Sequence, residues 1–228
     1  MWTSRSVWMP GKRSSSSGVT DMGDIRPIET VYNGYRFRSR LEARWAVFFD
    51  ALGVSYNYEP QGFVLHDGKK YLPDFFLPDF NLFVEIKASR QADDQKAKTF
   101  SEDNNVGGVL VCYGDPASRD LRFLTANESD WGGGGCYDTD WGDYYRTTFQ
   151  VSTIGEVFIF VNDDKPERCF YEVKHVYSAW SYPVSDDFCD KLVEKAEALA
   201  RQARFEHGDQ PKIRSLIKAE EDYFGVPF

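Results

Sequence analysis

Three residues able to act on a phosphate group stand close together in a strongly apolar stretch. Asp74 follows Pro73, and Glu85 and Lys87 stand two positions apart in the next apolar run. Charges beside so much apolar surface are costly unless they are paired or bind a metal. Two acids and a lysine in this setting indicate a metal-dependent site that cuts phosphodiester bonds. The apolar neighbours are Leu72, Phe75, Phe76, Leu77, Leu82, Phe83, Val84 and Ile86.

A hairpin between the two runs would make the acids neighbours. Residues 71–77 and 82–88 are strand candidates, and residues 78–81 form a turn. A turn centred in that segment places Asp74 directly opposite Glu85, about 5 Å apart at Cβ. Two carboxylates at that distance repel unless a cation or a proton lies between them.

Strand alternation then places both acids and Lys87 on the same side of the sheet. An alternative is a surface hairpin whose three charged side chains face water. The charged side also carries Leu72, Phe76 and Phe83, whereas the opposite, core-facing side carries Phe75, Leu77, Leu82, Val84 and Ile86.

Mg²⁺ is the natural cation for such a pair, because it prefers hard oxygen ligands and keeps part of its water shell. Asp74, Glu85 and the backbone carbonyl of Ile86 would hold it, and Mn²⁺ would serve as a substitute. The metal would polarise a phosphate oxygen and help to generate hydroxide. Lys87 would orient the attacking water or stabilise the charge that develops on the phosphate.

A helix is expected from about residue 38, upstream of the two runs. Its apolar residues recur at helical spacing, and Gly53 follows them as a C-terminal stop. The segment begins Ser39-Arg40-Leu41-Glu42, which is the pattern of a capping box. The apolar positions are Leu41, Trp45, Phe48, Phe49 and Leu52.

Glu42 has two interpretations. As the third residue of a capping box, it would reach back to the start of its own helix. As a functional residue, it would point along the edge of the helix toward the hairpin and become a further ligand of the metal or of its water. The two roles require different geometries of the same side chain.

Basic residues surround the start of this helix. Four arginines within nine positions of a helix N-terminus favour a phosphate-binding surface, and a solvated helix face is the alternative. Lys96, in a helix expected over 89–104, is a further candidate for nucleic-acid contact, with an ordinary surface position as its alternative. The arginines are Arg36, Arg38, Arg40 and Arg44.

Four short motifs follow one another in a recognisable order: Arg38-Ser39-Arg40-Leu41-Glu42, Tyr58-Glu59-Pro60, Tyr71-Leu72-Pro73-Asp74-Phe75 and Val84-Glu85-Ile86-Lys87. Together they resemble the PD-(D/E)XK nuclease superfamily. The resemblance is strongest to small phage and bacterial members related to transposon-end and very-short-patch repair nucleases. It covers about residues 30–115.

The resemblance implies an α/β fold with a restriction-endonuclease-like core, in which helices flank a central mixed β-sheet. It also implies Mg²⁺-dependent hydrolysis of phosphodiester bonds. In that pattern Glu42 matches the helix acid, Asp74 the strand acid, and Glu85 and Lys87 the Glu-x-Lys pair. All four signature positions are filled, so the resemblance implies an intact catalytic site.

Three regions are expected along the chain. Residues 1–24, rich in Ser, Gly and Arg, form a flexible arm, and residues 25–126 form the nuclease-like core. Residues 127–228 form an α+β elaboration or a partner-binding region, which begins with an acidic Gly-rich loop over 127–143. Its expected elements are strands at 144–151, 156–161 and 168–177 and helices at 186–206 and 211–223.

The net charge of −9 argues against a general nucleic-acid coat protein. The acidity lies in residues 101–228, which carry 13 Lys and Arg against 24 Asp and Glu, so a local basic surface near the motifs is compatible with it.

The widely spaced cysteines do not form a zinc pattern. With no apolar run of about 20 residues and no signal peptide, we expect a cytoplasmic protein, in the bacterial host if the chain is phage encoded.

We therefore expect a Mg²⁺-dependent endonuclease acting on DNA, of phage or mobile-element origin. One alternative is a non-catalytic interaction or assembly protein on the same fold, which the acidic, aromatic C-terminal half favours. Another is a nuclease subunit that is active only with a basic protein partner, bound through that acidic half, because the net charge disfavours tight DNA binding by the chain alone.

Overall fold

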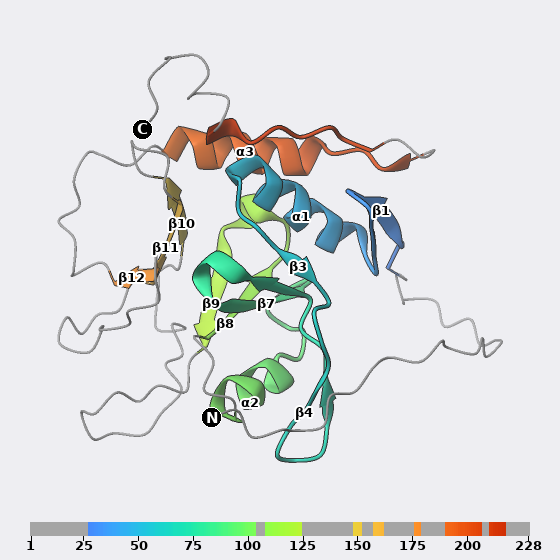
Figure 1. The fold of residues 1–228 in the computed structure, drawn as a ribbon, viewed down its shortest axis with the longest axis vertical. Helices are drawn as coiled ribbons and strands as arrows, with labels where there is room; N and C mark the ends of the chain where they lie inside the picture. The colour runs from blue at the N-terminus through green and yellow to red at the C-terminus, as the bar shows by residue number, and fades with distance from the viewer. Residues whose placement is uncertain are drawn as a thin grey trace.

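The computed structural model describes residues 27–103, 108–124, 148–151, 157–161, 176–178, 190–206 and 210–217. The expected N-terminal arm and the Gly-rich loop lie outside these residues. Within them the fold is α/β, with a mixed five-stranded central sheet and three helices (Figure 1). This confirms the predicted fold class at the level of a mixed sheet flanked by helices.

The central sheet has the strand order β3-β6-β7-β8-β9. Strands β7 and β8 are parallel, and the other neighbours are antiparallel. Helix α2 connects the parallel pair, as a parallel crossover requires. β8 is buried along its whole length, which explains its continuous apolar sequence. The strands are β3 (Asn57–Tyr58), β6 (Phe75–Leu77), β7 (Leu82–Lys87), β8 (Val109–Tyr113) and β9 (Asp120–Leu124).

The β6–β7 hairpin has the predicted register. Its pairs are Phe75 with Val84, Phe76 with Phe83 and Leu77 with Leu82. A short 3₁₀ turn over Pro78–Phe80 joins the strands, and Asn81 ends it in the left-handed region at φ 49°. The strand expected over 71–77 is interrupted, because β5 ends at Tyr71 and β6 begins at Phe75. Asp74 therefore stands just before the first pair, and its N–H donates to the carbonyl of Val84 at 3.1 Å, so the regular register does not extend to Asp74 and Glu85.

Helix α1 (Arg40–Leu52) covers one face of the sheet, and α3 (Asp190–Gln202) packs along α1 (Figure 1). Ser39 caps α1 by accepting the N–H of Glu42, and Gly53 ends it at φ 70°. The indole N–H of Trp45 donates to the carbonyl of Gly114 at 3.0 Å, which ties α1 to the end of β8. The core on this face includes Phe37, Phe48, Phe49, Leu52, Phe75, Leu77, Leu82, Val84, Leu110 and Leu192.

The opposite face of the sheet is covered as well. Helix α2 (Gln95–Asp103) and the hairpin of β4 (Phe63–Val64) and β5 (Lys70–Tyr71) lie over it (Figure 1). The side of the hairpin that carries the charges is therefore a second core rather than a solvated surface. Its buried or half-buried rings are Phe63, Tyr71, Phe76, Phe83, Phe100 and Tyr113.

Two elements of the core region were not expected from the sequence: strand β9 and the hairpin of β1 (Thr30–Tyr32) and β2 (Tyr35–Phe37). The hairpin turns at Asn33-Gly34, and both residues have positive φ, as a tight two-residue turn requires. It leads directly into Ser39, so β2 sets where α1 begins.

The described parts of the C-terminal half join the same core. Strands β10 (Thr148–Val151), β11 (Val157–Val161) and β12 (Val176–Ser178) form a second, three-stranded sheet near the expected positions. Phe149 and Ile159 of that sheet are buried in the core beneath α1. Arg119 binds Glu197 of α3 through two hydrogen bonds of 2.7 and 3.0 Å, which joins α3 to the segment before β9.

Three helix predictions differ from the structure in extent. The helix expected over 186–206 ends at Gln202, the last residue of α3. The helix expected over 89–104 begins only at Gln95, because residues 88–94 form bends and turns. The helix expected from 211 is absent over residues 211–215. Across the described segments, none of the helices has the length and apolar character needed to cross a membrane.

Candidate active site

Asp74 stands directly before β6, where both its backbone and its side chain bond to β7. Its Oδ2 accepts the backbone N–H of Ile86 at 2.7 Å. The carboxylate of Asp74 therefore satisfies a donor of the neighbouring strand. Asp74 is 3% exposed, which excludes the alternative of a surface hairpin with its acids in water.

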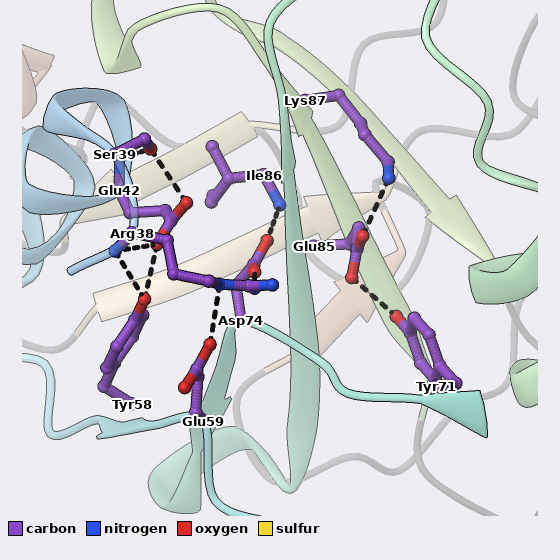
Figure 2. A network of polar contacts seen from close by, with 10 residues as sticks. All are labelled: Arg38, Ser39, Glu42, Tyr58, Glu59, Tyr71, Asp74, Glu85, Ile86 and Lys87. Atoms are coloured by element: carbon purple, nitrogen blue, oxygen red, sulfur yellow. Dashed lines mark hydrogen bonds and ion pairs between the residues drawn. The ribbon is translucent and has the colours of Figure 1, made fainter. Parts of the chain in front are cut away.

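Arg38 is the cation that faces this buried acid. Its Nη2 donates to Oδ1 of Asp74, and its Nε lies 2.6 Å from Oε1 of Glu59 (Figure 2). Glu59 has a backbone φ of 44°, a left-handed conformation that is uncommon for a residue other than glycine. Arg38 thus bridges two carboxylates at the same end of the β3–β6 pair, where the backbone N–H of Glu59 donates to the carbonyl of Asp74 at 2.8 Å.

Glu42 occupies the capping position expected of it. Its Oε1 accepts the hydroxyl of Ser39 at 2.8 Å, and its Oε2 accepts the backbone N–H of Arg38 at 3.1 Å. The phenol of Tyr58 also donates to Oε2, at 2.6 Å. Glu42 is 8% exposed, so these donors satisfy an acid that has little contact with water. The Glu42 side chain thus reaches back to the start of its own helix, as the capping interpretation predicts.

Glu85 has its own pair of donors. The phenol of Tyr71 donates to Oε2 at 2.9 Å, and Nζ of Lys87 donates to Oε1 at 2.8 Å. Glu85 is 9% exposed, whereas the side chain of Lys87 is 21% exposed. Lys87 is thus the member of this group that lies nearer to solvent.

Electrostatics couple the three acids. Burial raises the pKa of Asp74 well above its usual value, and the negative charges of Glu85 and Glu42 raise it further. The guanidinium of Arg38 and the N–H of Ile86 act in the opposite direction. Burial lowers the pKa of Arg38, but the carboxylates of Asp74, Glu59 and Glu42 outweigh this effect and raise it. The site carries a local excess of negative charge that calls for a cation.

The predicted residues form two adjacent groups, as Figure 2 shows: Glu42 and Asp74 lie with Arg38, and Glu85 lies with Tyr71 and Lys87. Within the described segments, no three His, Cys, Asp or Glu side chains are arranged to hold a metal ion. The donor chemistry nevertheless fits Mg²⁺, because Glu42, Asp74 and Glu85 offer carboxylate oxygens, the hard ligands that this ion prefers.

The predicted phosphate-binding residues are distributed over several surfaces. Arg38 is at the site, Arg36 is exposed 3.6 Å from Glu29, and Arg40 pairs with Glu206 at 2.9 Å. Arg44 lies one turn after Arg40 on α1 and is half-buried. Lys96 is exposed on α2 and donates to the carbonyl of Lys70 at 3.2 Å.

Sequence reasoning left the partners of the three acids and of Arg38 unassigned. Tyr58, Glu59 and Tyr71 all stand within the motifs described above, but no role follows from their positions in the chain. Tyr58 precedes Glu59 on the strand beside Asp74, and Tyr71 stands three residues before Asp74. Such spacing signals proximity to the site, whereas the particular hydrogen bonds depend on how the strands are placed.

Comparisons with protein-family models, with curated proteins and with solved structures found no match to this chain.

Proposed function

We propose that this protein is a metal-dependent endonuclease that hydrolyses DNA phosphodiester bonds on a restriction-endonuclease-like core. The observation that carries the proposal is the burial of Asp74, just before β6, near two further buried acids, Glu42 of α1 and Glu85 of β7, whose charges act on it. Burying several like charges together is costly, and active sites are where proteins commonly bear that cost. Lys87 completes the set with a cation at 2.8 Å from Glu85.

Asp74, Glu85 and the carbonyl of Ile86 would hold Mg²⁺ or Mn²⁺, with Glu42 as a further ligand of the metal or its water. The bound metal supplies Lewis-acid polarisation of the phosphate and lowers the pKa of water. Hard oxygen donors of this kind suit Mg²⁺ better than softer cations.

The protein's own side chains would orient the other reactants. Lys87 is fixed by Glu85 and partly open to solvent, so its ammonium would position the attacking water or stabilise charge on the phosphate oxygens. Tyr71 holds the second oxygen of Glu85, which leaves Lys87 and Glu85 in a defined orientation. Arg36, Arg40, Arg44 and Lys96 would contact the DNA backbone.

The charge distribution bears on how DNA is recruited. The net charge is −9, and residues 101–228 alone account for an excess of 11 acidic residues. DNA affinity rests largely on neutralising phosphates, so the acidic half would face away from DNA or bind a basic protein partner. A subunit activated by such a partner in a bacterial cytoplasm, of phage or mobile-element origin, is the form of the proposal that this charge favours.

A second function is favoured by one observation: the three acids all have protein donors. Hydrogen bonds from Ser39, Tyr58 and Tyr71, with those of Arg38 and Lys87, satisfy them without any ligand. A buried network of this kind also suits a non-catalytic interaction protein. The two functions differ in that only the nuclease is expected to gain thermal stability from Mg²⁺ or Mn²⁺.

The direct test is cleavage of supercoiled plasmid and branched DNA with Mg²⁺ or Mn²⁺, alone and with proteins co-expressed from neighbouring genes. We expect cleavage by the wild type that is lost in Asp74→Ala and in Lys87→Ala. Cleavage that persists unchanged in both variants, or that never occurs although metal binds, would reject a nuclease active site at these residues.

A further inference from the structure

Arg38 occupies a position that connects the fold to the site. It stands between β2 and the N-cap of α1, and its backbone N–H donates to Tyr58 at 2.9 Å and to Glu42 at 3.1 Å. The backbone is therefore fixed by two groups of the candidate site. The Arg38 side chain is therefore able to change rotamer while its backbone stays in place.

The guanidinium supplies the positive charge that the buried acids require. Asp74 has 5% of its side chain exposed and lies near Glu42 and Glu85, so a proton or a cation must offset its charge. Nη2 of Arg38 bonds to Oδ1 of Asp74, while Oδ2 bonds to Ile86. A metal ion that binds Asp74 through Oδ1 would compete with this guanidinium, because two cations at the same oxygen repel each other.

The surroundings allow that displacement. The Arg38 side chain is 45% exposed although its acid is buried, so solvent reaches the guanidinium. Glu59 pairs with Nε on the outer side and is itself 26% exposed. If the guanidinium left Asp74, it would lose that contact and keep its ion pair with Glu59. Asp74 would retain its hydrogen bond to Ile86 throughout.

We propose that Arg38 is a resident counter-ion which leaves Asp74 when a divalent metal binds, remains tethered to Glu59, and then contacts the phosphate being cut. This inference rests on the proposed nuclease function. A guanidinium suits both partners, because it binds carboxylate and phosphate in the same forked geometry. Binding of the metal would thereby move an arginine to where the substrate needs one.

Metal affinity is the first test, because a competing cation weakens it. Mn²⁺ titrations by calorimetry would compare the wild type with Arg38→Gln and with Arg36→Gln, which changes an exposed arginine two positions away. We expect Arg38→Gln to bind Mn²⁺ about tenfold more tightly and Arg36→Gln to match the wild type. Equal or weaker binding by Arg38→Gln would overturn the counter-ion role. Absence of binding in all three proteins would overturn the nuclease proposal too.

Nitrogen-edited NMR of the wild type detects the movement of the Arg38 guanidinium directly. This measurement remains possible if Arg38→Gln fails to fold. The Nε–H signal of Arg38 is assigned by its loss in Arg38→Lys. We expect it to shift as Mg²⁺ saturates the protein, while the signal of Arg36 stays in place. A saturated protein whose Arg38 signal is unchanged would show that the guanidinium stays on Asp74.

DNA binding separates this role from a merely structural one. In a Lys87→Gln background, which prevents cleavage, adding Arg38→Gln should weaken DNA binding in Mg²⁺ while it tightens metal binding. The control is Arg201→Gln, which changes an exposed arginine on α3 that pairs with Asp115. Loss of a structural residue would weaken both affinities, so a parallel decrease would contradict the inference.

Discussion

The phenol of Tyr71 donates a hydrogen bond of 2.9 Å to Oε2 of Glu85, and both side chains are buried. Tyr71 also packs against Phe100 of α2, with ring centroids 5.0 Å apart. The orientation of Glu85 therefore depends on the β4–β5 hairpin and on α2, which cover that face of the sheet. Partners of metal ligands contribute to affinity by fixing the orientation of the ligand.

Tyr71→Phe removes this hydrogen bond and keeps the ring. We predict that the variant binds Mn²⁺ about tenfold more weakly, because Glu85 loses the donor that orients it. Tyr32→Phe is the matched control, since Tyr32 donates to Asp50 at 2.7 Å away from the candidate site. It should lower the melting temperature without changing metal affinity. Equal metal affinities in the two variants would contradict a positioning role for Tyr71.

Lys87→Gln should separate binding from chemistry. It removes the ammonium next to Glu85, so we predict that DNA cleavage falls by at least about a hundredfold while Mn²⁺ still binds. Lys69→Gln, in the exposed β4–β5 turn, is the control and should cleave like the wild type. Single-turnover cleavage rates together with calorimetry measure both properties. Undiminished cleavage by Lys87→Gln would exclude it from the reaction.

The raised pKa of Asp74 predicts a pH-dependent stability in the absence of metal. Ionisation of Asp74 destabilises the fold once the pH rises through its raised folded-state pKa, and this effect is absent below the ordinary value of 3.8. Asp74→Asn cannot ionise and still accepts the N–H of Ile86. We therefore expect Asp74→Asn to melt at a higher temperature than the wild type at pH 8 in EDTA, with the difference shrinking toward pH 4.

Asp79→Asn, in the exposed turn of the same hairpin, is the control for that melting series and should follow the wild type. An Asp74→Asn protein that is less stable than the wild type at every pH would give the opposite sign. That result would mean that the ion pair of Asp74 with Arg38 stabilises the fold by more than burial of the charge and repulsion from Glu42 and Glu85 destabilise it.

The attachment of α3 to the core is testable through Glu197. Glu197 is buried and accepts two hydrogen bonds from Arg119, whose side chain is 42% exposed. Loss of one charge from such a pair should lower the free energy of unfolding by about 2 kcal/mol, less than for a fully buried pair. Glu194→Gln, 3.8 Å from the same arginine and exposed, should change it little. Urea unfolding of both variants measures the difference, and equal losses would contradict this attachment.

Sequence reasoning reached the elements that depend on local signals. The register of the β6–β7 hairpin follows from a short turn between two apolar runs, and the limits of α1 follow from Ser39 and Gly53. Strand β9 was missed because Asp120–Leu124 mixes charged and apolar residues, although it pairs along its length with β8. Local signals therefore predicted β7, which carries Glu85, and β6, which begins one residue after Asp74.

Contacts between distant segments could not be predicted in the same way. Arg38 and Asp74 are 36 positions apart, and their ion pair depends on how β2, β3 and β6 are placed. The covering of the charged face by α2 likewise arises from packing, and it makes a second core of the face that the surface-hairpin alternative placed in water. Sequence alone identified the acids, and the structure shows which protein groups hold them.

In the proposed nuclease, Asp74, Glu85 and the carbonyl of Ile86 hold the catalytic divalent metal. Anomalous diffraction from a crystal of the protein soaked in Mn²⁺ tests it most directly. We predict a single strong peak bound by the carboxylates of Asp74 and Glu85 and by the carbonyl of Ile86, with Arg38 withdrawn from Asp74. A peak elsewhere, or none while Arg38 remains on Asp74, would contradict the account.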